Sequence, residues 1–149
     1  MAAHRPSRSI HGTTEEAIVR LEQSPLRHTK TREAILEVMV KRHGPFSAEE
    51  LKDAVKGQKL DTVTVYRTLA SFEQAGLVRR CDFGDGVSRY EFQCEHEHHH
   101  HIICRSCRKI ENIDDCTIQE LEQMVKKKGF AEITHTLEFF GICKACRTA

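Results

Sequence analysis

The stretch DTVTVYRTLASFEQAG, residues 61–76, decides how the first half of the chain is expected to fold. Its apolar side chains Val65, Leu69 and Phe72 recur at the spacing of one helix face. Gly76 follows the run, and glycine commonly stands just beyond the end of a helix. The stretch therefore predicts one helix that stops at Gly76.

Two β-type runs come directly after this helix. They are LVRRCDF, residues 77–83, and SRYEFQC, residues 88–94, and the Gly-Asp-Gly of residues 84–86 between them predicts a hairpin. A helix followed by such a hairpin is typical of a winged helix-turn-helix. In that motif one helix enters the DNA major groove, where its early residues read base edges.

Three further helices are expected before residue 61. TTEEAIVRLEQS, residues 13–24, and KTREAILEVMVKRH, residues 30–43, carry apolar residues at helical spacing. Ser47 and Glu50 form a capping-box pattern that opens a third helix. Residues 1–93 therefore predict an N-terminal winged-helix domain.

Residues at two helix starts are the candidates for contact with DNA. Polar side chains at the start of the 61–75 helix suit base and phosphate contact, and cations near residue 30 suit phosphate. Winged helices also serve as protein-interaction modules, which remains the alternative for this half of the chain. The candidate DNA-binding residues are Arg27, Lys30, Arg32, Thr64, Tyr66 and Arg67.

The composition of the 149-residue chain is that of a globular protein, with 39% hydrophobic residues, 30% charged residues and a formal net charge of +1. No apolar run approaches the roughly 18 residues that span a bilayer, and the N-terminus lacks a secretory signal. We therefore expect a cytoplasmic protein without a membrane partner. Cysteines stay reduced in that compartment, so paired cysteines favour metal or redox chemistry over disulfides.

The cysteines divide the chain near residue 93. Six of the seven lie from Cys94 onward. Residues 94–149 begin with a β-like, histidine-rich run, continue with the helical pattern IQELEQMVKKKGF, residues 118–130, and end with the alternating pattern AEITHTLEFFGIC, residues 131–143. The sequence thus predicts an α+β protein whose second domain, residues 94–149, is an α/β unit.

Two Cys-x-x-Cys pairs, Cys104/Cys107 and Cys143/Cys146, predict a four-thiolate zinc site. The two-residue spacing lets both thiolates of a pair reach one tetrahedral ion at about 2.3 Å. Such a site would tie the C-terminal tail to the segment near Cys104. A redox dithiol is the alternative, but two matched pairs without a thioredoxin-like context favour structural zinc.

The histidine run of residues 98–101 predicts further metal ligands. Side chains alternate between faces along a strand, so His98 and His100 share one face and His99 and His101 share the other. Neither pair closes a site alone. His135 is a natural partner for one face, and Glu91, Cys94 and Glu111 are near in sequence to the other.

Together these features resemble the ferric uptake regulator family of bacterial metal-responsive repressors. The matching stretches are TVYRTL (64–69), HHHHIICRSC (98–107) and CKAC (143–146). The resemblance implies a winged-helix domain, a C-terminal dimerisation domain, a homodimer, and metal-gated binding to double-stranded operator DNA. The family includes iron, zinc, manganese and peroxide sensors, so the resemblance does not fix the metal.

The resemblance also assigns the ligands. Cys104, Cys107, Cys143 and Cys146 fall on the family's structural zinc site. The regulatory site takes Glu91, His99, His101 and Glu111, to which we add Cys94 because thiolate favours zinc over ferrous iron. An additional site takes His98, His100 and His135.

Two positions depart from the family pattern. Pro45 stands where the family often has a histidine, and His43 lies two residues earlier. Ile118 stands where the family has an acidic ligand, and Asp115 or Glu120 is the expected substitute.

We therefore expect a metal-dependent repressor of metal-homeostasis genes, with a structural Zn²⁺ and a regulatory Zn²⁺ or Fe²⁺. Zinc is the favoured signal, and an iron, manganese or peroxide sensor is the alternative within the family. A zinc hydrolase is the alternative outside it, but no His-Glu-x-x-His motif is present. The chain is not expected to be an enzyme.

Overall fold

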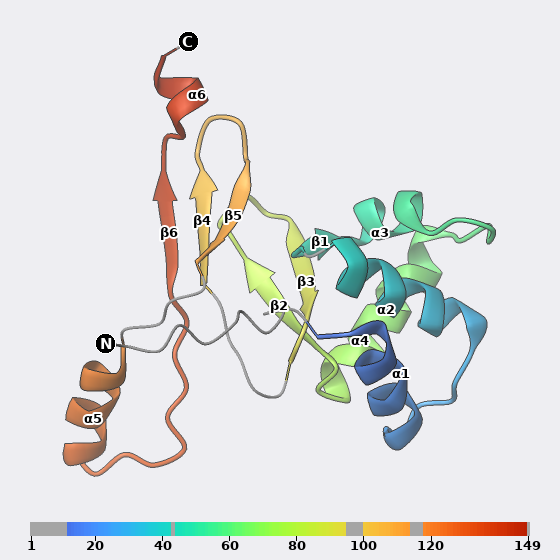
Figure 1. The fold of residues 1–149 in the computed structure, drawn as a ribbon, viewed down its shortest axis with the longest axis horizontal. Coiled ribbons are helices and arrows are strands. Elements are labelled where there is room, and N and C mark those ends of the chain that lie inside the picture. Colours follow the sequence, from blue (N-terminus) through green and yellow to red (C-terminus); the bar gives the residue numbers. More distant parts are fainter. Residues whose placement is uncertain (1–11, 43, 95–99, 114–117, 149) are drawn as a thin grey trace, which may run out of the picture. The chain divides into compact units, whose positions relative to one another are not determined.

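A computed structural model describes residues 12–42, 44–94, 100–113 and 118–148 of the chain (Figure 1). His43, His98, His99 and Asp115, which were considered as ligands, lie outside these ranges. Backbone contacts divide the chain into two compact units, residues 1–96 and residues 97–149. Within the described ranges, no helix combines the length and the apolar character needed to cross a bilayer.

Four helices make up most of the first unit: α1 (Thr14–Gln23), α2 (Lys30–Arg42), α3 (Ala48–Ala54) and α4 (Thr62–Gln74). All four were predicted, and side-chain caps explain where α3 and α4 start. The Ser47 amide donates to Glu50 at 2.7 Å, and the Glu50 amide donates to Ser47 Oγ at 3.2 Å, which completes the predicted capping box. Asp61 caps α4 by accepting a hydrogen bond from the Thr64 amide at 2.8 Å.

A three-stranded antiparallel sheet completes this unit. The predicted hairpin is formed by β2 (Val78–Asp82) and β3 (Ser88–Phe92), and β1 (Phe46–Ser47) pairs with the other edge of β3. The sequence did not predict β1. Gly84 and Gly86 have φ of 73° and 76°, so the turn between β2 and β3 needs a backbone that glycine adopts without strain.

The core of the first unit lies between the helices and one face of this sheet. Val65, Leu69 and Phe72 of α4 are fully buried, as the helical spacing predicted. They pack in one cluster with apolar residues from all four helices, together with side chains of β2 and β3. The exposed face of α4 is therefore fixed by the burial of the opposite face.

The second unit is built on another three-stranded sheet with β4 (His100–Cys104) in the middle. β5 (Ile110–Ile113) pairs with it antiparallel, and β6 (Glu138–Gly141) pairs with it parallel. Between β5 and β6 in the sequence comes α5 (Gln119–Lys127), and α6 (Lys144–Arg147) follows β6 (Figure 1). The short helix α6 was not predicted.

The prediction of one strand over residues 131–143 was wrong for most of its length. Extended pairing begins at Glu138, which lies opposite His101, and ends at Gly141. Glu132 has a left-handed backbone with φ of 52°, which interrupts an extended run. The alternation of polar and apolar residues at 133–137 therefore does not represent strand pairing in the described structure.

Candidate metal centres

The four cysteines of the two Cys-x-x-Cys pairs come together at the end of β4. Cys104 ends β4, and Cys107 lies in the turn after it. Cys143 directly precedes α6, and Cys146 lies within α6. Their four sulfur atoms all lie within 4.8 Å of one another. Cys107 Sγ and Cys143 Sγ are 3.8 Å apart, which is the edge of a tetrahedron with zinc–sulfur bonds of about 2.3 Å. The donor set and its spacing therefore fit a structural Zn²⁺.

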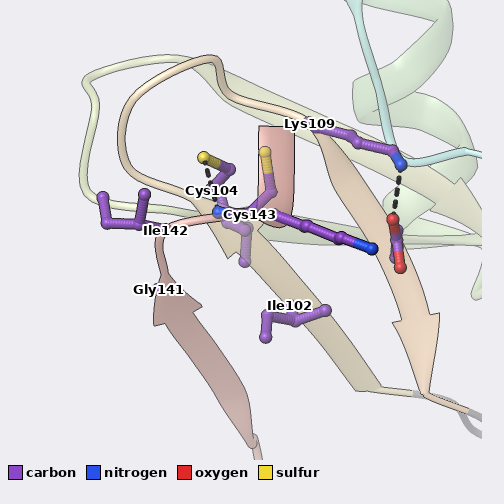
Figure 2. A pocket seen from close by; sticks show the side chains of 9 residues that line it. Ile102, Cys104, Lys109, Gly141, Ile142 and Cys143 are labelled. Atoms are coloured by element: carbon purple, nitrogen blue, oxygen red, sulfur yellow. Dashed lines mark hydrogen bonds and ion pairs between the residues drawn. The ribbon is translucent and has the colours of Figure 1, made fainter. Parts of the chain in front are cut away.

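The backbone around the cluster favours a thiolate at Cys104. The Cys143 amide donates to Cys104 Sγ at 3.3 Å, a hydrogen bond drawn in Figure 2. This amide, and then that of Cys107, lower the pKa of the Cys104 thiol to about 6. Amide donors stabilise the charged form in the same way at other thiolate sites. The Cys104 thiol therefore ionises more readily than an ordinary cysteine, as a zinc ligand must.

Cations stand beside this cluster. Lys109 and Lys144 line a cavity of about 270 Å³ together with Ile102, Cys104 and Cys143. Lys109 and the two cysteines are labelled in Figure 2. Hydrogen bonding to Glu111 is the largest cause of the raised pKa of Lys109, and the Cys143 and Cys107 thiols add to it. A zinc ion with four thiolates carries a net charge of −2, which such ammonium groups partly offset.

A second group of donors forms around His135. His135 Nε2 lies 3.4 Å from His100 Nε2, and His135 Nδ1 lies 2.8 Å from a carboxylate oxygen of Glu122. His100 Nδ1 is held by the Leu137 carbonyl oxygen at 3.1 Å, which orients its other ring nitrogen toward His135. The structure therefore brings His100 and His135 together, and Glu122 of α5 contributes a carboxylate at this position.

Glu122 was missed by the sequence analysis, which proposed Asp115 or Glu120. Glu120 lies in the first turn of α5 with an exposed side chain, whereas Glu122 is half-buried beside His135. The signal was available, because Glu122 is one of the acidic residues in the first turn of this helix. Glu122 could be identified only from the backbone path of residues 128–135, and the sequence pattern had wrongly predicted a strand from residue 131.

The residues expected at the regulatory site occupy the ends of several strands. In the first unit, buried Glu91 on β3 forms an ion pair with Arg79, and half-buried Cys94 follows β3. In the second unit, the buried His101 ring lies 3.6 Å from a Glu138 carboxylate oxygen. Exposed Glu111 on β5 pairs with Lys109 at 2.6 Å.

Cys94 has a close contact with the start of the helical region. Its sulfur accepts a hydrogen bond from the Gly12 amide at 2.9 Å. A Cβ atom on Gly12 would lie 2.8 Å from the Phe92 ring and 3.2 Å from Cys94 Sγ, so a larger residue does not fit without movement. Two neighbouring segments therefore hold the Cys94 side chain in place.

Some of the candidate DNA-binding side chains are exposed, and others form hydrogen bonds within the protein. Tyr66 and Arg67 are exposed on α4, while the hydroxyl of half-buried Thr64 donates to the Asp61 carboxylate at 2.8 Å. Arg27 and Lys30 are exposed at the start of α2, whereas half-buried Arg32 donates a hydrogen bond to the Arg27 carbonyl oxygen. Thr64 and Arg32 thus order the local backbone.

The comparison with protein families decides the identity of the fold. The family described as the ferric uptake regulator family matches residues 23–140. The chain belongs to this family. It is therefore a metal-responsive transcriptional regulator and not an enzyme, and the alternative of a zinc hydrolase has no support.

Individual members of the ferric uptake regulator family agree over nearly the whole chain. The peroxide-responsive repressor PerR of Staphylococcus aureus is 32% identical over 142 residues, which cover 93% of this chain and 95% of the relative. The ferric uptake regulator of Helicobacter pylori has a solved structure with a TM-score of 0.76 and 29% identity, covering 91% of this chain and 95% of the other. The iron-containing structure from Francisella tularensis has a TM-score of 0.70 and 31% identity, with 83% and 96% covered. The predicted α+β fold class, with an N-terminal winged helix and a C-terminal dimerisation domain, is confirmed.

Proposed function

We propose that this regulator is a homodimeric repressor that binds operator DNA when its sensor site holds Zn²⁺. The choice of zinc rests on the ion pairs and the hydrogen bond that the candidate sensor ligands already make. Glu91 and Glu111, which would suit ferrous iron, are already paired with Arg79 and Lys109. Cys94, which suits zinc, is held by an amide.

The choice of zinc depends on Cys94, because the two carboxylates would ligate either metal. A carboxylate that ligates any metal ion gives up part of its interaction with its arginine or lysine partner, whereas a thiolate ligand favours zinc over ferrous iron. The Glu91 side chain is 2% exposed, so its ion pair is little screened by solvent. The Cys94 sulfur accepts a hydrogen bond from the Gly12 amide, and an amide donor of this kind stabilises a thiolate. The sensor ligands are proposed to be Glu91, Cys94, His99, His101 and Glu111.

Two further ions complete the proposal. A structural Zn²⁺ is assigned to Cys104, Cys107, Cys143 and Cys146, whose geometry fits a tetrahedral site. An additional ion is assigned to His98, His100 and His135, with Glu122 as the acidic ligand. Three sites agree in number with the Helicobacter pylori relative, which is described as having three functional metal-binding sites.

The second unit is proposed to hold the dimer together. Leu121 and Met124 of α5 are 58% and 56% exposed, and Phe130 is 65% exposed. Phe139 and Phe140 on β6 are also exposed. Large apolar side chains gathered on one small unit favour burial against a second copy. Sedimentation at micromolar concentration should give twice the mass of the 17.1 kDa chain.

DNA binding is proposed to use the exposed face of α4. In a dimer the two recognition helices must reach half-sites about one helical turn, roughly 34 Å, apart. An ion that fixes the setting of each winged helix lets both helices dock together. Linkage then requires DNA to raise metal affinity by the same factor by which the metal raises DNA affinity.

The test is a DNA titration of protein from which every metal ion except the structural zinc has been removed. The duplex is one selected from a random pool by the zinc-loaded wild-type protein, and the salt concentration is held constant. Buffered Zn²⁺, Fe²⁺ without oxygen, and Mn²⁺ are compared. Zinc should activate at the lowest free concentration, and Cys94→Ser should weaken activation by zinc more than by iron. Cys116→Ser serves as the cysteine control, because Cys116 belongs to none of the proposed ligand sets. Activation by iron or manganese alone would refute the choice of zinc.

A further inference from the structure

One arginine of α1 joins the end of the recognition helix to the end of the wing. Arg20 donates hydrogen bonds through its two terminal nitrogens, one to the Gly76 carbonyl oxygen at 2.8 Å and the other to the Gln93 carbonyl oxygen. Its guanidinium also lies 5.2 Å from the centre of the Phe92 ring. The planar guanidinium group of Arg20 thus links two backbone segments that are far apart in sequence.

The two carbonyls belong to segments that meet directly. Gly76 follows α4 with φ of 71°, and the Leu77 amide donates to the Phe72 carbonyl oxygen at 2.9 Å, which ends the helix. The Gln93 amide donates to the Leu77 carbonyl oxygen at 2.9 Å, which extends the β2–β3 ladder past the wing. Arg20 therefore braces the junction between the last turn of α4 and the exit from β3.

The same junction carries the two sensor ligands proposed for the first unit. Glu91 precedes Gln93 by two residues and Cys94 follows it directly, so the Gln93 carbonyl belongs to the peptide group that orients Cys94. The Gly12 amide, just before α1, holds the Cys94 side chain through its sulfur. Any change in the position of Cys94 on metal binding must therefore pass to a peptide that Arg20 links to α4.

We propose that Arg20 is a positioning residue that couples the metal ligands at the end of β3 to the recognition helix α4. The proposal rests on the proposed function, because it assumes that the metal controls DNA binding. Arg20 is assigned no contact with the metal or with DNA. It fixes the end of α4 relative to Cys94, so that the metal-bound position of Cys94 selects one setting of α4.

A purely structural role for Arg20 is the competing explanation. α1 is held independently by Ala17 and Leu21, which are both fully buried in the core. Loss of the Arg20 guanidinium should therefore leave α1 docked. This property allows coupling and stability to be measured separately.

The experiment compares wild type with Arg20→Met, Arg20→Lys and Arg42→Met in the full-length dimer. Arg20→Met keeps the apolar stem, Arg20→Lys keeps the charge without the planar fork, and Arg42→Met removes the same charge from the exposed end of α2. Each protein is titrated with the selected duplex with and without Zn²⁺. Amide exchange is followed for α1 and for the amides of Gly76, Leu77 and Gln93.

In wild type and Arg42→Met, zinc should raise DNA affinity by the same factor. In Arg20→Met that factor should fall by about fivefold or more, with Arg20→Lys between the two. Exchange should accelerate at the junction amides and stay unchanged in α1. An unchanged zinc factor in Arg20→Met overturns the inference, as does a loss of protection throughout α1 that lowers DNA affinity equally with and without zinc. A wild-type protein without any zinc effect refutes the proposed function itself, and the inference falls with it.

Discussion

Removal of the metal from the four-cysteine cluster is expected to unfold the second unit and leave the first unit folded. The reason lies in how little apolar core the second unit has. Among its described residues, the buried apolar side chains are Ile103 and Cys104. Full burial of an isoleucine side chain contributes about 1.5–3 kcal/mol. This contribution is small beside the backbone entropy of ordering, about 1–2 kcal/mol for each residue.

A structural zinc ion would supply the missing free energy. Metal binding at four-ligand sites contributes an apparent 10–16 kcal/mol, roughly, in small zinc-dependent domains at neutral pH. In this chain the ion would join Cys104 at the end of β4 to Cys143 beside α6, and so tie β4 to the C-terminal tail. Loss of the ion removes several times the free energy that burial of Ile103 provides. The first unit has a continuous core from four helices and a hairpin, and contains none of these four cysteines.

The assay is amide exchange and thermal unfolding of the protein before and after treatment with a strong chelator under reducing conditions. After treatment, the β4 amides should lose protection, while the α4 amides should keep theirs. Added zinc should restore the original pattern. Cys107→Ser should resemble the chelated protein without any chelator. Retained protection of β4 in the chelated protein would show that the unit folds without its metal, which contradicts the reasoning.

Four smaller predictions concern single residues. Ser47→Ala removes the side-chain cap of α3 and should lower the free energy of unfolding of the first unit by about 1 kcal/mol, measured with urea. Arg67→Ala should weaken DNA binding on every sequence and reduce the dependence of log affinity on log salt by about one, and an unchanged salt slope would exclude a phosphate contact. Glu122→Gln should weaken the ion assigned beside His135, measured by metal titration, while Glu122→Asp should retain part of the affinity. The Thr64 amide and hydroxyl lower the pKa of Asp61 below its ordinary value of 3.8. The stabilising effect of Asp61 should therefore be complete above pH 3.8 and lost as the pH falls through the lower folded-state pKa. The free energies of unfolding of wild type and Asp61→Asn, measured against pH, should converge in acid.

The helices of the first unit were predictable because their determinants are local. A cap, an apolar period and a terminating glycine all fall within the segment that becomes the helix, as residues 61–76 illustrate. The strand β1 was not predictable in this way. It contains two residues, and it exists because Phe46 and Ser47 meet Tyr90 and Arg89 on a strand that comes much later in the chain.

The second unit was harder to predict because an alternating pattern does not by itself make a strand. Residues 131–137 alternate as a strand would, but β6 begins only at Glu138. The same segment carries His135 toward His100 and Glu122, so its path is tied to side-chain contacts between polar groups. Sequence reasoning could identify His135 as a ligand candidate, but it could not identify Glu122 without that path.

The central strand of the second unit, β4, carries side chains whose contacts are mostly with polar groups. β4 carries His100 toward His135, His101 toward Glu138, and Cys104 toward Cys143, so each of these side chains contacts a polar group instead of filling an apolar core. Buried polar groups destabilise a fold unless they are satisfied, and imidazole, carboxylate and thiolate groups are all zinc ligands. We therefore expect the stability of the second unit to depend on bound metal. In a regulator with a separate sensor ion, a second unit ordered by its structural ion would hold the proposed sensor ligand His101 of β4 in a fixed position.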